Sequence, residues 1–151
     1  MKPLVASFLI ALCVQPTGVA AQTGSKDAAP AACPAPAEVT QLQLYGLWQA
    51  QFDGLTQDAV LLLEKHPDYP ESVRGSIRRD GPGNPERALV SGDVDEGVFT
   101  LDESADGRTI SATWSGNVVD QSCGKEIRGI WTNTHDNTTR GFVLRKLPGW
   151  Q

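Results

Sequence analysis

The stretch Trp114-Ser115-Gly116-Asn117-Val118 holds the pattern that decides the fold, a glycine with an apolar residue two positions to either side. This pattern, or a close variant, occurs six times, centred on Gly46, Gly75, Gly92, Gly116, Gly129 and Gly141. Residues two apart share one face of a β-strand, so each glycine shares a face with its flanking residues, which are apolar in five copies. A glycine on a buried face lets a strand bend sharply, and repeated bending of this kind is typical of a small closed barrel.

Turn signals between these segments predict eight strands. Asp53-Gly54 and Asp106-Gly107 favour tight turns, and the two prolines within residues 66–70 exclude the interior of a strand. We therefore expect strands at residues 44–52, 58–65, 72–79, 86–94, 97–103, 109–118, 124–133 and 139–147. Because short connections make neighbouring strands pair antiparallel, the sequence predicts an all-β, eight-stranded antiparallel up-and-down barrel over residues 44–147.

Alternation along the strands predicts which side chains face the interior. The first strand should direct Leu44, Gly46 and Phe52 inward, and the sixth should direct Ile110 inward, whereas the last strand is ambiguous. The aromatic residues expected inside, and therefore the candidate ligand-binding residues, are Trp48, Phe52, Phe99, Trp114 and Trp131. These rings either line a cavity that the glycines enlarge or fill the barrel completely.

Residues 1–21 are typical of a secretory signal peptide. Lys2 supplies a positive charge, residues 4–14 form an apolar run too short to span a bilayer, and Val19-Ala20-Ala21 offers small residues for cleavage. We expect a mature chain that begins at Gln22 and is periplasmic or secreted. Residues 22–43 are rich in Ala and Pro and predict a disordered or extended tether, with a short helical turn within residues 38–43.

Cys33 and Cys123 are the cysteines that remain after cleavage, since Cys13 lies in the leader. In an oxidising compartment an even pair is typical of one disulfide. In the predicted meander, the turn that holds Cys123 and the segment before the first strand lie at the same barrel end, as a disulfide requires. Closing this loop of about ninety residues should stabilise the fold by roughly 3–5 kcal/mol.

The chain is acidic, with a net charge of −5 that becomes −6 when Lys2 is lost with the leader. We therefore expect neither nucleic acid nor an anionic membrane surface as a partner. We also expect no membrane span after the leader, because no later segment is long and apolar enough. Acidic residues gather between Asp93 and Asp106, and this stretch, which includes Glu103, predicts a solvated hairpin edge.

Motifs of catalysis and cofactor binding are missing from the sequence. It holds no Gly-x-Ser-x-Gly, no phosphate-binding loop and no cysteine–histidine pair, so we expect a protein that is not an enzyme and has no cofactor. His66 and His135 fall in turns at opposite ends of the predicted barrel and cannot share one ion. We therefore expect no metal site, which would need three or four ligands.

Gly46-Leu47-Trp48 opens the predicted first strand, and Arg145 lies near the end of the last strand, its neighbour in a closed barrel. A Gly-x-Trp on the first strand, with an Arg from the last strand packed on that Trp, resembles the signature of the calycin superfamily. That group includes lipocalins, avidins and small bacterial metalloprotease inhibitors. The resemblance covers residues 44–147 and implies that the Arg145 cation lies over the Trp48 indole.

Two expectations of function follow from the resemblance and from the aromatic interior. The first is an exported barrel that binds a small apolar molecule in its interior. The alternative is a module that binds an exported protein, such as a protease inhibitor that uses the N-terminal tether. Ile130, which should lie outside, and the strand of residues 59–63, which is apolar on both faces, favour a protein partner.

Overall fold

The computed structural model of this chain describes residues 33–81 and 86–149. The predicted signal peptide, residues 1–21, and residues 22–32 of the predicted tether lie outside the described residues. Within the described part of the chain, no helix is both long enough and apolar enough to cross a membrane.

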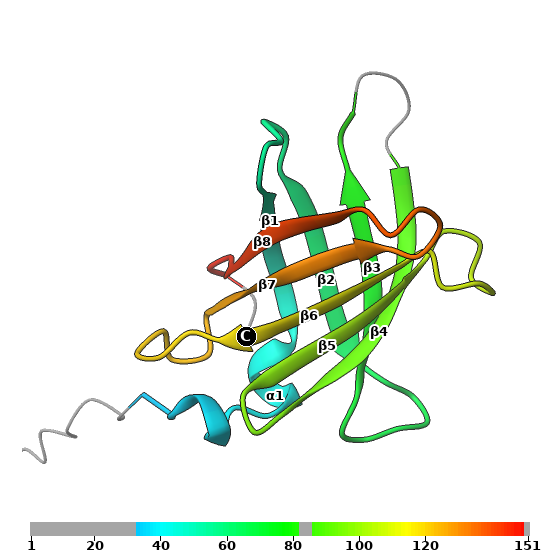
Figure 1. Cartoon of the computed structure of the whole chain (residues 1–151). Coiled ribbons are helices and arrows are strands. Elements are labelled where there is room, and N and C mark those ends of the chain that lie inside the picture. Colours follow the sequence, from blue (N-terminus) through cyan, green and yellow to red (C-terminus); the bar gives the residue numbers. More distant parts are fainter. Residues whose placement is uncertain (1–32, 82–85, 150–151) are drawn as a thin grey trace, which may run out of the picture. The chain divides into compact units, whose positions relative to one another are not determined.

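Eight strands form one closed antiparallel barrel, in which each strand pairs with the next along the chain and β8 pairs with β1 (Figure 1). The all-β up-and-down barrel predicted from the sequence is thus confirmed. The strands are β1 (Gly46–Phe52), β2 (Ala59–Lys65), β3 (Val73–Arg79), β4 (Glu86–Asp95), β5 (Val98–Ser104), β6 (Ala112–Val118), β7 (Glu126–Asn133) and β8 (Thr139–Lys146). A 3₁₀ turn (Pro36–Glu38) and the short helix α1 (Gln41–Leu44) precede them.

The two ends of the barrel are covered differently. The last residues of β1, β3, β5 and β7 lie at one end, which we call the mouth. The turns that follow β2, β4 and β6 lie with α1 at the other end, which we call the base (Figure 1). At the base, Gln41 Nε2 donates to the carbonyl of Pro70 in the β2–β3 turn at 3.1 Å, and so fixes α1 to the barrel.

The first strand begins later than residue 44, because α1 occupies the start of the predicted strand. Thr40 caps this helix, since its Oγ1 accepts from the amide of Leu42 at 3.4 Å and its own amide donates to Gln43 Oε1 at 2.9 Å. Gly46 then begins β1 with a φ of 121°, a conformation that residues with a side chain rarely adopt. The glycine of the Gly-x-Trp segment is therefore required where the chain passes from the helix into the barrel.

The sixth strand also begins later than predicted, at Ala112. The carboxylate of Asp106 holds the preceding turn, because it accepts hydrogen bonds from the amides of Arg108 and Thr109, both at 2.8 Å. Ile110 lies between this turn and the strand and is 48% exposed. The expectation that Ile110 faces the interior is therefore wrong, because the alternation of β6 does not extend back to it.

Side chains pack the middle of the barrel. The rings of Trp48, Phe99 and Trp114 are at most 1% exposed. On β8 the inward side chain is Phe142, and this resolves the ambiguity of that strand. Aliphatic side chains fill the space around the rings, among them Leu61, Leu63, Val73, Ile77, Leu101, Ile127 and Leu144.

The repeated glycines let strands coil closely together and make room for a ring. A Cβ on Gly116 would lie 2.6 Å from the carbonyl oxygen of Arg128 and 3.0 Å from Phe142 Cζ. Gly116 pairs directly with Gly129, where a Cβ would collide with the backbone of Ser115. The space that these missing side chains provide is thus already used by backbone and by the Phe142 ring.

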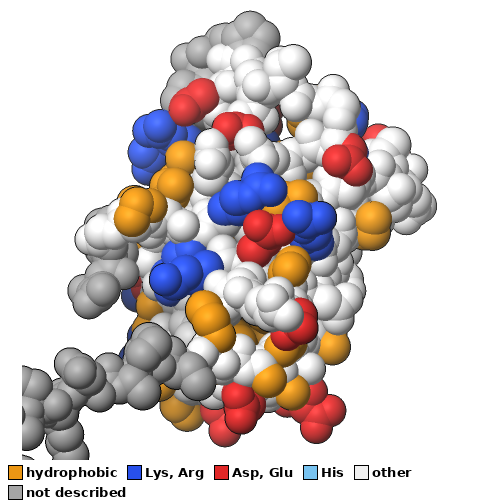
Figure 2. All heavy atoms as spheres, turned by 90° about the vertical axis from the view of Figure 1, so that its left-hand side faces the viewer, with side chains coloured by type: hydrophobic (Ala, Val, Ile, Leu, Met, Phe, Trp, Pro, Cys, Tyr) orange, Lys and Arg blue, Asp and Glu red, His pale blue; other side chains and the backbone are white. Residues whose placement is uncertain are grey.

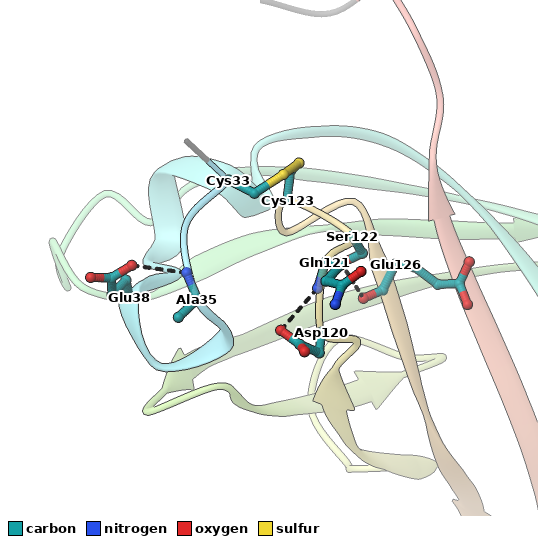
Figure 3. The surroundings of a disulfide bond; sticks show 8 residues. All are labelled: Cys33, Ala35, Glu38, Asp120, Gln121, Ser122, Cys123 and Glu126. Carbon is teal, nitrogen blue, oxygen red and sulfur yellow. Dashed lines mark hydrogen bonds between the residues drawn. A yellow bond between two sulfur atoms is a disulfide. The ribbon is translucent and has the colours of Figure 1, made fainter. Parts of the chain in front are cut away.

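Cys33 and Cys123 form the predicted disulfide, with their Cα atoms 4.6 Å apart (Figure 3). Cys123 lies in the β6–β7 turn at the base, so the prediction that both cysteines lie at one barrel end is confirmed. The bond joins the start of the described chain to a turn 90 residues further on. The segment before β1 is therefore covalently attached to the base.

Candidate ligand-binding site at the barrel mouth

A buried carboxylate, that of Glu103 on β5, lies inside the barrel at the mouth. Glu103 is 4% exposed and faces inward, because it continues the alternation of Phe99 and Leu101. Arg79, the last residue of β3, binds it in a bidentate pair: Nη1 donates to Oε1 at 2.6 Å and Nη2 donates to Oε2 at 2.8 Å. The expectation that Glu103 belongs to a solvated hairpin edge is therefore wrong.

Two tryptophans share the same carboxylate. Trp114 Nε1 and Trp131 Nε1 each donate to Glu103 Oε2 at 3.2 Å. Together with the two bonds from Arg79, these indoles give the carboxylate a complete set of hydrogen-bond donors. Among the described residues, no buried side-chain nitrogen or oxygen atom lacks a partner. The charged network is thus compatible with the apolar interior around it.

The pKa of Glu103 lies below that of an ordinary glutamate. Burial, the largest single effect, raises this pKa because the charged form loses hydration, but the hydrogen bond and the positive charge of Arg79 act against it. The indole donors of Trp131 and Trp114 lower the pKa further. Glu103 is therefore ionised at neutral pH, and Arg79 neutralises its charge.

Aromatic rings flank the Arg79 side chain. Its guanidinium carbon lies 5.6 Å from the centroid of Phe52 and 5.8 Å from that of Trp131. Phe52 also lies 5.2 Å from Trp114 and 6.1 Å from Trp131, in tilted and edge-on arrangements. Two rings and one carboxylate thus hold the arginine, and these groups together form a preorganised surface at the mouth.

A pocket of about 330 Å³ lies at this surface. Its lining includes Phe52, Leu55, Arg79, Glu86, Trp131 and Arg140. A concave site with apolar walls and a few fixed polar groups is typical of a small-molecule site. The mouth is therefore the candidate functional site of the barrel.

Two of the five predicted ligand-binding residues, Phe52 and Trp131, line this pocket. Trp114 contacts the Phe52 ring and the carboxylate of the network, but it is 1% exposed. Trp48 and Phe99 are fully buried in the packed core and do not line the pocket. The structure thus brings Phe52, Trp114 and Trp131 together at the mouth and leaves the other two rings in the core.

At the base, the cation over Trp48 is Lys146 and not Arg145. Lys146 Nζ lies 5.5 Å from the Trp48 ring centroid and donates to the carbonyl of Gln43 in α1. Side chains alternate along β8, so Lys146 takes the inward position and Arg145 points to the outer face. The expectation that Arg145 packs on Trp48 is therefore wrong by one position along the strand.

Arg145 belongs instead to a network of mixed charge on the outer face. It donates to Gln51 Oε1 at 2.6 Å and to Glu126 Oε2 at 3.3 Å. Arg128 donates to the other oxygen of Glu126 at 2.7 Å. Figure 2 shows basic and acidic side chains close together in the middle of one face, with hydrophobic ones between them. The network thus pairs both arginines with the one carboxylate of Glu126.

The features that favour a protein partner lie elsewhere on the molecule. Ile130 is 48% exposed on β7. On β2, the outward side chains of Val60 and Leu62 are half-buried. Residues 22–32 of the predicted tether lie outside the described residues. Of the features predicted to favour a protein partner, the described residues therefore supply Ile130 as an exposed apolar side chain.

Metal binding finds no support in residues 33–81 and 86–149, where no three His, Cys, Asp or Glu side chains are grouped to hold an ion. His66 has a structural task at the base. Its Nδ1 accepts from the amides of Asp68 at 3.2 Å and Tyr69 at 3.1 Å and so stabilises the β2–β3 turn.

Arg79 and Glu103 were not predicted as site residues from the sequence, although the alternation of inward and outward side chains marks both as inward. Arg79 lies two residues after inward-facing Ile77, and Glu103 lies two residues after inward-facing Leu101. A charged residue that continues an inward apolar series is the signal of a buried pair.

No family model matches the chain, and no curated protein matches it in sequence. The eight-stranded antiparallel barrel is consistent with a calycin-like fold.

Proposed function

We propose that the protein is an exported, calycin-like barrel that binds a small and mainly apolar molecule in the pocket at its mouth. The observation that carries this proposal is the pocket of about 330 Å³ with Phe52, Leu55 and Trp131 in its lining. The Arg79–Glu103 pair supports the proposal, because it fixes the rings before any ligand arrives. A preorganised site loses less entropy on binding than a site that must first become ordered.

The packed core limits how deep the ligand reaches. Because Trp48 and Phe99 are fully buried, the ligand contacts the rim and the Trp131 ring and does not enter the middle of the barrel. Binding should therefore change the fluorescence of Trp131 and leave the environment of Trp48 unchanged.

Binding of the uncharged dye N-phenylnaphthylamine to the full chain tests this proposal. Leu55→Asp at the rim should weaken binding about fivefold or more, since burying part of a leucine side chain contributes about 1 kcal/mol. Val98→Asp is the matched control, because Val98 is exposed to a similar degree, 46% against 48% for Leu55, and does not line the mouth. The proposal fails if the dye does not bind, or if the two variants weaken binding equally.

Binding of an exported protein stays a prediction, with exposed Ile130 as its structural support. A pull-down from periplasmic extract, with the full chain and with a chain lacking residues 22–32, tests it. Recovery of one partner by the full chain alone would assign that role to the N-terminal segment. Recovery of no partner by either chain would remove the basis for this alternative.

A further inference from the structure

The hydrogen-bond donors and acceptors at the mouth are used unequally. An arginine side chain has five N–H groups. Glu103 accepts hydrogen bonds from two of the N–H groups of Arg79, and the other three N–H groups have no partner among the described residues. The Arg79 side chain is 25% exposed and lines the pocket. Donors therefore remain available to a ligand on the same residue that anchors the network.

The acceptor side of the same network is full. Glu103 Oε2 accepts from Arg79, Trp114 and Trp131, and Oε1 accepts from Arg79. An ionised carboxylate offers about four acceptor sites. Glu103 has none left for a donor or a cation carried by a ligand.

Arg140 adds a second guanidinium to the lining of the pocket. It lies on β8, is exposed, and makes no ion pair or side-chain hydrogen bond to the described residues. Glu86, the one other acidic residue of the lining, lies on β4, on the opposite side of the closed barrel. The rim is therefore polarised: Arg140 lies away from the carboxylate of Glu86, whereas Arg79 lies beside it as its partner in the β3–β4 register.

We infer that the ligand is an amphipathic anion, and this inference rests on the proposed function. Its apolar part packs against Phe52, Leu55 and Trp131. Its carboxylate or another oxyanion accepts hydrogen bonds from Arg140 and from the free N–H groups of Arg79. Hydrogen bonds between a guanidinium and an oxyanion are about twice as strong as neutral ones. A cationic amphiphile would meet only Glu86, because Glu103 is already fully bonded.

A matched pair of dyes tests the anionic group, since anilinonaphthalene sulfonate differs from N-phenylnaphthylamine by its sulfonate. The intact protein should bind the sulfonate about tenfold more tightly than the uncharged dye. Arg140→Gln should remove most of that preference. Arg87→Gln is the control, because Arg87 points outward on β4 and its substitution changes the net charge by the same amount as Arg140→Gln. It should leave the preference intact.

The possible outcomes separate this inference from the proposed function. Equal binding of the two dyes to the intact protein would overturn the anionic class and leave the mouth site standing. Equal loss of preference in Arg140→Gln and Arg87→Gln would also overturn it, because net charge alone would then explain the effect. If Glu86→Gln raises the affinity for the sulfonate, the polarised rim is supported. Failure of both dyes to bind would remove the proposed function itself.

Discussion

Each end of the barrel holds a cation beside an indole, but the hydrogen-bond acceptors for these groups differ between the two ends. At the base, Trp48 and Lys146 donate to backbone carbonyls of α1, and a disulfide attaches the preceding segment. At the mouth, the corresponding donors converge on the side-chain carboxylate of Glu103. The base is therefore held by backbone and covalent bonds, whereas the mouth depends on one ionisable group that pH or a single substitution can remove.

Loss of the carboxylate at the mouth should have the largest effect. Glu103→Leu leaves Arg79 charged and unpaired beside the core, and it removes the acceptor of two indoles. The free energy of unfolding should fall by about 3–5 kcal/mol, as urea denaturation would measure. Asp102→Leu is the control, because Asp102 is the exposed neighbour on the same strand and should change stability by no more than about 0.5 kcal/mol.

A double variant tells whether the unpaired charge causes that loss. Arg79→Met combined with Glu103→Leu should recover most of the stability, because a buried ion pair is often replaceable by apolar side chains of similar volume. If the double variant is as unstable as Glu103→Leu alone, the two indole bonds are the larger contribution.

Removal of the disulfide should have the next largest effect and should sharpen the contrast between the ends. Cys33→Ser with Cys123→Ser should lower the free energy of unfolding by about 2–5 kcal/mol. Because the bond lies at the base, the affinity of the mouth for N-phenylnaphthylamine should be unchanged while the barrel remains folded. A lost affinity in a variant whose near-UV circular dichroism is native would mean that the ends are coupled.

Acid should weaken the mouth through the carboxylate of Glu103. The pKa of Glu103 is lowered in the folded protein, so its contribution to stability is fully present above the ordinary glutamate pKa of about 4.3 and is lost as the pH falls through the lower, folded value. The pKa values of Asp106, Glu126 and Asp136 are also lowered, through hydrogen bonds that they accept. To isolate the effect of Glu103, the intact protein and the Arg79→Met, Glu103→Leu double variant should be unfolded in urea at neutral and at acid pH. The double variant should lose less stability in acid than the intact protein.

Loss of the cation at the base should have the smallest effect. Lys146→Met removes the ammonium group over Trp48 and its bond to α1, and it should cost about 1 kcal/mol. Burial, with a smaller effect from the charge of Lys125, lowers the pKa of Lys146, so the charged amine already bears a desolvation cost. Arg145→Met, on the outer face, should cost less than Lys146→Met when both are measured by urea denaturation. The reverse order would restore the role at Trp48 that the sequence suggested for Arg145.

The barrel was predictable because its determinants are local. Asp53-Gly54 and Asp106-Gly107 mark turns, and Gly116 and Gly129 mark bends, whatever surrounds them. The disulfide followed from an even pair of cysteines that the strand order places at one end of the barrel. The start of β6 was not predictable in the same way. The carboxylate of Asp106 holds the turn before this strand, and the residue composition of the turn does not reveal how long it is.

The site was predictable only in part, because its polar half depends on pairing between distant strands. Phe52 and Trp131 were identified from alternation and lie in the lining of the pocket. Alternation along β5 marks Glu103 as inward, but nothing local marks its pairing with Arg79, which lies 24 residues earlier. The prediction that Arg145 packs on Trp48 was wrong by a single residue, because a shift of one residue along a strand moves a side chain to the opposite face.

The seam between β1 and β8 sets the order in which the barrel can be completed. Trp48 pairs with Lys146 at one end of this seam and Phe52 pairs with Phe142 at the other, so the first strand finds its second neighbour only when the last strand is in place. Until then β1 and β7 each present a row of unpaired N–H and C=O groups, to which another chain can add. Closure of the seam is also the contact of greatest sequence separation in the barrel, and such contacts form slowly. A chain interrupted before Thr139 would therefore keep two open edges and should associate with its own copies.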